Sequence, residues 1–181
     1  KNWFYVPSIT LNNNVTNFIA DCSQVSGCFQ LNMQTLLDNS PSLKELTLKN
    51  LYFPTNMANC SSDSLISLTL LNLDEDQGAN FGNDLNLNQF PNLLKLDIEQ
   101  CQSCALPNLQ SINNIDNLTN LNLDVPTLSF LDPSNASNLT DLNLKRVSLS
   151  SIYLSNCTLL ERLGLDDVDL TTIYLNGANT L

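Results

Sequence analysis

Residues able to carry out acid–base chemistry are few in this 181-residue chain. It contains no histidine, which removes the commonest general base and every nucleophile system built on one. Paired carboxylates such as Asp166 and Asp167 remain, and two carboxylates suffice for glycoside hydrolysis. Adjacent residues of a strand, however, point to opposite faces. We therefore expect no enzymatic activity, no catalytic residues and no cofactor.

An oxygen-rich segment is the first candidate for metal binding. Asp74, Glu75 and Asp76 are followed by Gly78 and Asn80, and carboxylate and amide oxygens are ligands for calcium. The spacing does not fit an EF-hand loop, which needs Asp or Asn at its fifth position and Gly at its sixth. Here Gly is fifth and Ala is sixth. A solvated, projecting loop over 74–84 without a metal is the prediction.

The six cysteines allow several interpretations. Cys101 and Cys104 have zinc or redox spacing, but one such pair without histidine cannot complete a tetrahedral zinc site locally. We therefore expect them to be structural. Cys22 and Cys60 fall at similar distances after two copies of a repeated phrase, so a Cys22–Cys60 disulfide is a candidate. A local bridge between Cys22 and Cys28 competes with it, and unpaired buried cysteines are the third option.

That phrase organises the chain: an apolar residue, two variable residues, Leu, one variable residue, then Leu or Ile. Measured from the middle leucine, successive copies lie 22, 28, 25, 21 and 21 residues apart. Alternation of leucine with polar residues predicts a half-buried strand, and so short a repeat must stack on its neighbours to bury its apolar edge. The copies span 43–48, 65–70, 93–98, 118–123, 139–144 and 160–165, with 6–11 as an earlier seventh.

The phrase resembles the leucine-rich repeat family over nearly the whole chain. This resemblance implies an α/β or mainly β solenoid: a right-handed superhelix with a parallel β-sheet on its concave face. Residues 1–181 would form a single domain of about seven repeats. The 21-residue repeats are similar to those of bacterial surface proteins, whereas 40–46 and 90–93 are similar to repeats of plant intracellular receptors.

The chain departs from the family pattern at one position. The family usually has Asn or Cys three residues after the last Leu of the phrase, where it bonds neighbouring turns. Asn14 and Cys101 match that position. The other turns should close on apolar packing at Leu51, Leu73, Pro126, Val147 and Val168.

Two further elements are expected on the opposite wall. Residues 147–154 and 168–175 repeat one another and alternate in polarity, which predicts a second short extended segment, with 127–131 as a looser copy. Earlier in the chain, apolar residues at 29, 33, 36 and 37 share one helical face, and Pro41 would end that helix. We predict a helix there on the convex side.

Six of the seven basic residues lie on or just after the phrase. Side chains at equivalent positions of adjacent strands sit about 5 Å apart, so charge ladders are one explanation: Lys145 beside Asp124 and Asp166, and Arg162 beside Asp141. A ligand footprint is the alternative, and the two can coexist. On that alternative, the predicted concave contact surface consists of Lys44, Glu45, Lys49, Lys95, Asp97, Glu99, Asn120, Asn122, Asp141, Asn143, Lys145 and Arg162.

Composition restricts the partners. The net charge is −11, which disfavours nucleic acid and anionic membranes, and no apolar run reaches the roughly 20 residues that cross a bilayer. Only 14% of residues are charged, which favours a secreted or cell-surface protein over a cytoplasmic one. If the chain is a secreted glycoprotein, Asn117 and Asn138 are the informative acceptors, because they hold the same place in two repeats.

These observations favour a ligand-recognition module that binds a protein or a glycan on its concave face. The alternatives are a structural or assembly element of a surface layer or larger complex, and the sensing segment of an intracellular receptor. Leu139, Leu160 and Leu181 are evenly spaced and no capping sequence follows, so we expect a fragment of a longer chain, or partner contacts through an uncapped C-terminal end. Leu142 and Leu163 should be core residues at equal depth.

Overall fold

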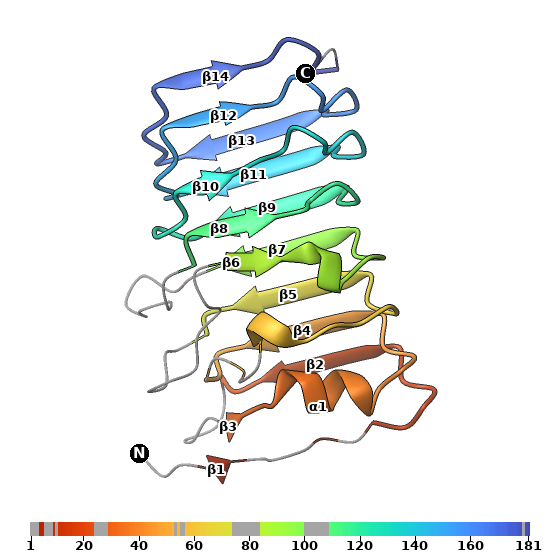
Figure 1. Cartoon of the computed structure of the whole chain (residues 1–181). Coiled ribbons are helices and arrows are strands. Elements are labelled where there is room, and N and C mark those ends of the chain that lie inside the picture. Colours follow the sequence, from red (N-terminus) through yellow and green to blue (C-terminus); the bar gives the residue numbers. More distant parts are fainter. Residues whose placement is uncertain are drawn as a thin grey trace.

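Stacked strands are the main regular elements of the computed structural model (Figure 1). The structure describes residues 4–5, 9, 11–23, 29–52, 54, 57–73, 84–99, 109–178 and 180–181. Within these ranges the chain passes back and forth between two walls, with one α-helix and two short 3-10 helices. The fold is therefore mainly β and solenoid-like.

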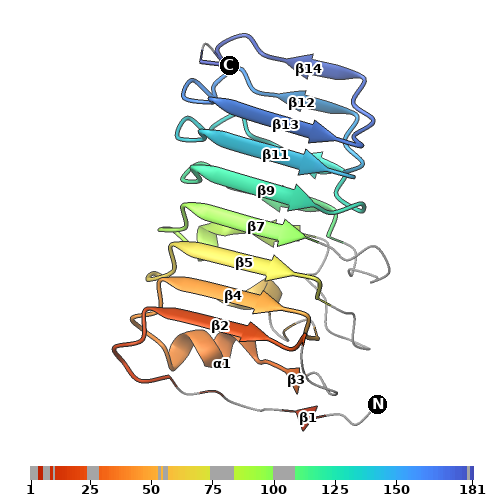
Figure 2. The same cartoon turned by 180° about the vertical axis from the view of Figure 1, so that it is seen from behind.

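The front wall is one parallel sheet of seven strands, in the order β13-β11-β9-β7-β5-β4-β2 (Figure 2). Each of the six phrases predicted between 43 and 165 forms one of its strands. The strands are β2 (Asn17–Asp21), β4 (Glu45–Lys49), β5 (Ser67–Leu71), β7 (Lys95–Glu99), β9 (Asn120–Asp124), β11 (Asp141–Lys145) and β13 (Arg162–Asp166).

The leucines of the phrase form rows across this sheet. Leu121, Leu142 and Leu163 are direct partners on successive strands, and the period of two turns this row towards the core. Leu142 is 1% exposed, but Leu163 is only partly buried against the core. The prediction of equal depth is wrong, because β13 is the edge strand and nothing described covers its far side.

The first strand of the front wall lies later in the chain than the sequence predicts. Ile9 and Leu11, from the predicted copy at 6–11, are not in a strand; the rest of that copy, apart from these two residues, lies outside the described residues. Residues 17–21 pair with β4 instead, Phe18 opposite Leu46 and Ala20 opposite Leu48. Aromatic and small side chains there replace the leucines that define the other copies.

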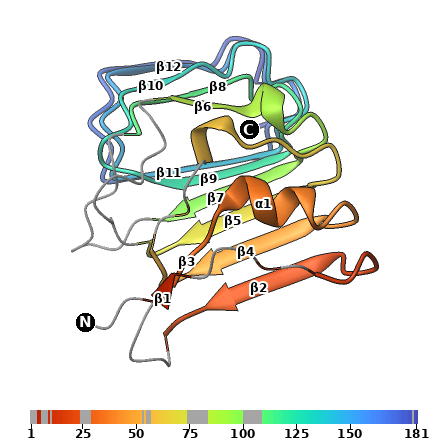
Figure 3. The ribbon, with the colours of Figure 1, turned by 60° about the horizontal axis from the view of Figure 1, so that its bottom comes forward.

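The back wall consists of shorter parallel strands (Figure 3). The predicted extended segments are confirmed, because β12 pairs with β14 and β10 with β8. Tyr153 and Tyr174 are partners in that first pair, and their rings stack with centroids 4.4 Å apart. The strands are β6 (Asp84–Asn86), β8 (Ser111–Asn113), β10 (Phe130–Leu131), β12 (Ser151–Tyr153) and β14 (Thr172–Tyr174), with β1 (Phe4–Tyr5) pairing β3 (Phe29–Gln30) near the start.

Helix α1 (Met33–Asp38) covers the beginning of the core. Its buried face is Met33, Leu36 and Leu37, as predicted, and the Thr35 N–H donates to the Asn32 side chain at 3.0 Å. Residue 29 was predicted to share this face but belongs to β3, because the Asn32 cap begins the helix after it. The 3-10 helices are η1 (Met57–Asn59) and η2 (Leu87–Gln89).

A left-handed residue follows several front-wall strands. Asn50, Asn72, Arg146 and Asp167 have φ between 51° and 55°. This conformation suits asparagine and aspartate better than most residues, and it redirects the chain at the strand end. Apolar side chains then close most of these turns, as predicted, with Leu51, Leu73 and Val147 each at most 3% exposed.

Across the described ranges, no helix has the length and apolar character needed to cross a membrane.

Candidate functional site

The outward side of the seven-stranded sheet, called the sheet face below, presents its side chains in columns. Asp97, Asn122, Asn143 and Gly164 form one such column, each beside the next along the sheet. In Figure 2 this side faces the viewer, and none of the labelled elements crosses it. The sheet face is therefore an open, mainly polar surface on the seven-stranded sheet.

The predicted contact residues do come together on the sheet face. Eleven of the twelve lie on β4, β7, β9, β11 and β13, and Lys44 immediately precedes β4. They do not form one continuous charged patch, because β5 separates β4 from β7 and contributes the uncharged residues Ser67, Thr69 and Leu71. The predicted surface, which consists of charged residues and asparagines, does not include these three, nor Ile19, which is 66% exposed on β2.

Part of the basic pattern consists of ion pairs. Arg162 bonds to Asp141 through its Nε, and the Lys145 Nζ lies 3.7 Å from Asp166. These two pairs confirm the predicted Arg162–Asp141 and Lys145–Asp166 contacts, whereas Asp124, the other predicted neighbour of Lys145, forms its ion pair with Arg146. Among the described residues, Lys44, Lys49 and Lys95 form no ion pair within 4.0 Å, so these three remain available to a ligand.

Arg146 forms the most buried of the ion pairs. Its Nε donates to Asp124 at 2.6 Å, and both side chains are at most 20% exposed. This hydrogen bond raises the pKa of the guanidinium, and the neighbouring charge of Asp167 acts in the same direction. Arg146 thus fastens the end of β11 to the end of β9 and is not part of the open surface.

Amide side chains link neighbouring strands on the sheet face. The Asn122 amide donates to Asp97 at 2.8 Å and to Glu99 at 3.1 Å, and the Asn143 amide donates to Asn122 at 2.8 Å. In the adjacent column, Asn120 donates to Asp141 at 2.9 Å. These bonds hold the predicted contact residues in one arrangement before any ligand arrives.

Asp97 is the electrostatically unusual member of the surface. Partial burial raises the pKa of its carboxyl, and the neighbouring Glu99 adds to the rise. The Asn122 hydrogen bond and the charge of Lys49 oppose the rise. Two neighbouring carboxylates sharing one amide donor therefore create a locally negative point at the centre of the sheet face.

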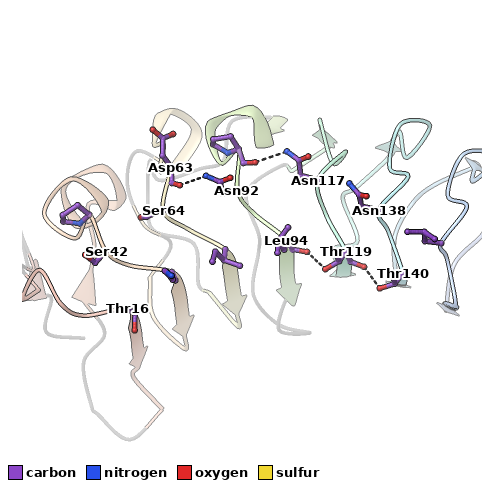
Figure 4. Close-up of a pocket in the computed structure, with 15 residues that line it drawn as sticks. Thr16, Ser42, Asp63, Ser64, Asn92, Leu94, Asn117, Thr119, Asn138 and Thr140 are labelled. Atoms are coloured by element: carbon purple, nitrogen blue, oxygen red, sulfur yellow. Dashed lines mark hydrogen bonds between the residues drawn. The ribbon is translucent and has the colours of Figure 1, made fainter.

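A groove runs along one edge of the sheet, where the chain enters each strand (Figure 4). It encloses about 910 Å³ and is lined mostly by apolar atoms. Its lining reaches from Thr16, just before β2, to Leu159, just before β13, and includes Ile66 and Leu94 near the middle. We refer to this feature as the edge groove; of the predicted contact residues, it contains Lys44 alone.

Side chains of the edge groove hold successive turns together. Asn92 donates to the Asp63 carbonyl at 2.7 Å, and Asn117 donates to the Pro91 carbonyl at 2.9 Å (Figure 4). Asn138 continues this amide ladder with a longer bond of 3.4 Å to Asp116. The sequence prediction placed most turn closures on apolar packing alone and missed this ladder, although an asparagine precedes the first leucine in three copies.

Two cysteines are buried, protonated thiols. Burial raises the pKa of Cys60 to about 12 and that of Cys157 to about 11. The Cys60 thiol donates to the Met57 carbonyl at 3.2 Å, and Cys60 is free, so the predicted Cys22–Cys60 bridge is absent. Counting from the wrong first strand caused the error: Cys22 directly follows β2, whereas Cys60 lies beyond η1.

Several predicted features lie outside the described residues: Cys28, the loop from 74 to 83, and the pair Cys101 and Cys104. Within the part of the chain that is described, no three acidic or cysteine side chains are grouped to hold a metal ion. Asn117 and Asn138, the predicted glycan acceptors, are exposed, and each uses its amide to reach the preceding turn.

The end of the stack at β13 and β14 is apolar. Leu165, Ile173 and Leu175 are 38–44% exposed, whereas Leu144, Ile152 and Leu154 one turn earlier are fully buried. Stacking explains the difference, because each turn covers the one before it. The face presented by β13 and β14 is therefore core-like in composition.

Comparisons with models of known protein families, with curated proteins and with solved structures find no match to this chain.

Proposed function

We propose that the chain is a ligand-recognition module of the leucine-rich repeat type, with right-handed turns, that binds a protein or a glycan through the sheet face. The observation that carries this proposal is the open polar sheet, whose side chains stand in register on seven strands. A parallel sheet normally has both faces covered. An uncovered face of this size, furnished with linked polar groups, suits recognition of another polar surface.

Fixed side chains strengthen the proposal. Hydrogen bonds and an ion pair already hold the side chains of Asn122, Asp141 and Arg162 in place. These side chains would therefore lose little conformational entropy when a ligand binds. Lys49 and Lys95 supply cations that the described carboxylates do not pair. The net charge of −11 continues to argue against nucleic acid.

Binding to a glycan array and to a displayed library of folded domains tests this function. The double variant Lys95→Glu/Lys145→Glu should lose the interactions of the wild-type chain, because both changes reverse charge on the sheet face. Asp132→Lys is the matched control, since Asp132 is exposed and follows β10 on the back wall. Binding that survives the double variant and disappears with Asp132→Lys would show that the recognition face is elsewhere.

Assembly is the second candidate function, and the apolar end of the stack supports it. Strand β13 reads Arg162-Leu-Gly164-Leu-Asp166 and lies at the edge of the sheet. Paired antiparallel with a second copy about Gly164, Arg162 would face Asp166 of the other chain, and leucine would face leucine. Opposite charges directly across a strand pair are favourable.

Light scattering on the chain tests assembly. Association that Arg162→Asp weakens, and that Arg162→Asp/Asp166→Arg restores, would support the antiparallel pairing, because the double exchange restores opposite charges between the two copies although residue 162 still faces Asp141 with a like charge within each copy. A monomer at high concentration counts against it.

A location at the cell surface or outside the cell remains our proposal, with the cytoplasm as the alternative.

A further inference from the structure

The edge groove differs in chemistry from the rest of the molecule. Fifteen residues line it, and Lys44 and Asp63 are the charged ones among them, in a chain with 25 charged residues and a net charge of −11. The two opposite charges leave the lining with no net charge. An occupant with a net charge therefore has no excess of opposite charge to pair with in the groove.

The middle of the groove is apolar. Leu94 is 40% exposed and Leu159 is 50% exposed, although both are large hydrophobic side chains. Ile66 lies one strand from Leu94, and both residues precede strands that pair directly, β5 and β7. Neighbouring strands are about 4.8 Å apart, so Ile66 and Leu94 form a continuous apolar floor. Exposure of this apolar surface to water is unfavourable, and an occupant that covers it gains free energy.

The rim of the groove supplies fixed hydrogen-bond acceptors. The Thr119 hydroxyl reaches the Leu94 carbonyl at 3.1 Å and the Asn120 Oδ1 at 2.9 Å, and the Thr140 hydroxyl reaches the Thr119 carbonyl at 3.0 Å and the Asp141 Oδ2 at 2.8 Å. The single hydrogen of each hydroxyl goes to one of its two acceptors. Each hydroxyl oxygen keeps acceptor capacity. Asn92 and Asn117 likewise donate to the preceding turn and leave their carbonyl oxygens as acceptors. Each of these amides also keeps a second N–H donor, so the rim suits a partner that brings both donors and acceptors along its length.

The dimensions fit an extended chain. The lining follows seven strands from Thr16 to Leu159, which corresponds to about 29 Å at the usual strand spacing. A polypeptide in extended conformation covers that length with about eight or nine residues. It also presents backbone N–H donors to one side and side chains at every second position to a floor.

We propose that the edge groove binds an extended, uncharged polypeptide segment of about eight residues. Apolar side chains of the segment pack on Ile66 and Leu94, and its backbone N–H groups donate to the oxygens of Thr119, Asn92 and Asn117. The lining holds no aromatic ring. Sugar rings stack on the faces of aromatic side chains, so the groove lacks the surface on which a sugar would pack. The groove therefore favours peptide over sugar. The site shares only Lys44 with the predicted sheet-face contact residues and does not depend on the sheet-face function.

Selection from a phage-displayed library of random dodecapeptides on the immobilised chain provides the probe. We expect enrichment of sequences without charge that carry apolar residues at alternate positions. A synthetic peptide from the selection should bind equally well at low and high salt, because no ion pair contributes. Selection of strongly charged sequences, or no enrichment at all, would overturn the proposal.

Variants locate the bound peptide. Leu94→Glu puts a charge on the apolar floor and should weaken binding about tenfold or more, and Leu159→Glu repeats the test at a second exposed position. Phe130→Glu is the matched control, because Phe130 is 52% exposed on β10 of the back wall. Thermal melts verify that each variant is folded.

Methyl NMR of the unaltered chain avoids any dependence on folding of the variants. Peptide addition should shift the methyl signals of Ile66 and Leu94, while Ile19 on the sheet face stays unchanged. Shifts at Ile19 without shifts at Leu94 would overturn the assignment. So would binding lost in Lys95→Glu but kept in Leu94→Glu. A glycan-array signal that depends on Leu94, in the absence of any selected peptide, would replace the peptide with a sugar.

Discussion

Gly164 lies beside Asn143 in the sheet, and a methyl group added at Gly164 would overlap the Oδ1 of Asn143. The Asn143 amide donates to Asn122 on its other side at 2.8 Å. The missing side chain at Gly164 thus gives the Asn143 amide the room in which it completes the chain of bonds to Asn122 and Asp97.

Exchange of this glycine should couple to its neighbour. Gly164→Ala gains about 0.5–1 kcal/mol from reduced backbone entropy, but it displaces Asn143 and loses a hydrogen bond of similar value, so the net change should be near zero. In an Asn143→Ala background, Gly164→Ala should stabilise the chain by the full amount. Urea denaturation of all four proteins measures the coupling. Additive effects would show that the two side chains do not compete.

Position in the stack should control the cost of truncating a leucine. Leu142→Ala should destabilise the chain by about 2–5 kcal/mol, because Leu142 is covered on both sides. Leu163→Ala should cost about 1–2 kcal/mol, because Leu163 is only partly buried at the edge strand. Chemical denaturation gives both values. Equal losses would indicate that β13 is covered in solution, for instance by association.

Two carboxylates on the sheet face should respond oppositely to pH. Burial and Glu99 raise the pKa of Asp97, so the charged carboxylate destabilises the folded chain relative to the unfolded chain, and this penalty is complete above the raised pKa. Asp97→Asn should therefore stabilise the chain at neutral pH, and this gain should shrink as pH falls through the raised pKa.

The bond from Arg162 lowers the pKa of Asp141, so its contribution is present at neutral pH and lost as pH falls through that lowered pKa. Asp141→Asn should then destabilise slightly at neutral pH and have no effect in acid. Melting temperatures across a pH series, measured for both variants and the parent, compare the two slopes. Slopes of the same sign would contradict the assignment.

The buried thiols should be inert in the folded chain. With pKa values of about 12 for Cys60 and about 11 for Cys157, almost no thiolate is present at neutral pH, and the thiolate is the reactive form. Iodoacetamide should leave both thiols unmodified in the folded chain. Both should react once denaturant unfolds the chain, with no reductant present. Peptide mass mapping identifies the sites. Failure of Cys60 to react after unfolding would reveal a disulfide.

Sequence periodicity predicted the front wall better than the surfaces built on it. A leucine at the centre of a phrase is enough to locate a strand, because it must face the core in every turn. The same rule failed at β2, where Phe18 and Ala20 occupy the inward positions. Residues 6–11 fit the phrase more closely than β2 does, and the prediction therefore placed the first strand there. The side chains that fit at the inward positions of a strand depend on the space that the side chains of adjacent turns leave. The residues of a single phrase do not specify that space.

The edge groove illustrates the second kind of omission. Ile66, Leu94 and Thr119 occupy the same place in successive turns, yet they share no residue type. Only the strand register brings them together, so a search for repeated residue types does not find them. The amide ladder of Asn92, Asn117 and Asn138 did have a signal, the position before the first leucine, which the leucine-based pattern ignored.

Because each front-wall strand bonds only to the strands of adjacent turns, the stack has an unusual mechanical character. A force that separates β2 from β13 acts along the inter-strand hydrogen bonds. We expect it to break the hydrogen bonds of one strand pair at a time. Each 21-residue turn near β11 and β13 would release about 70 Å of chain once freed. The molecule would thus lengthen at low tension in steps, one turn per step, instead of resisting until the whole domain yields.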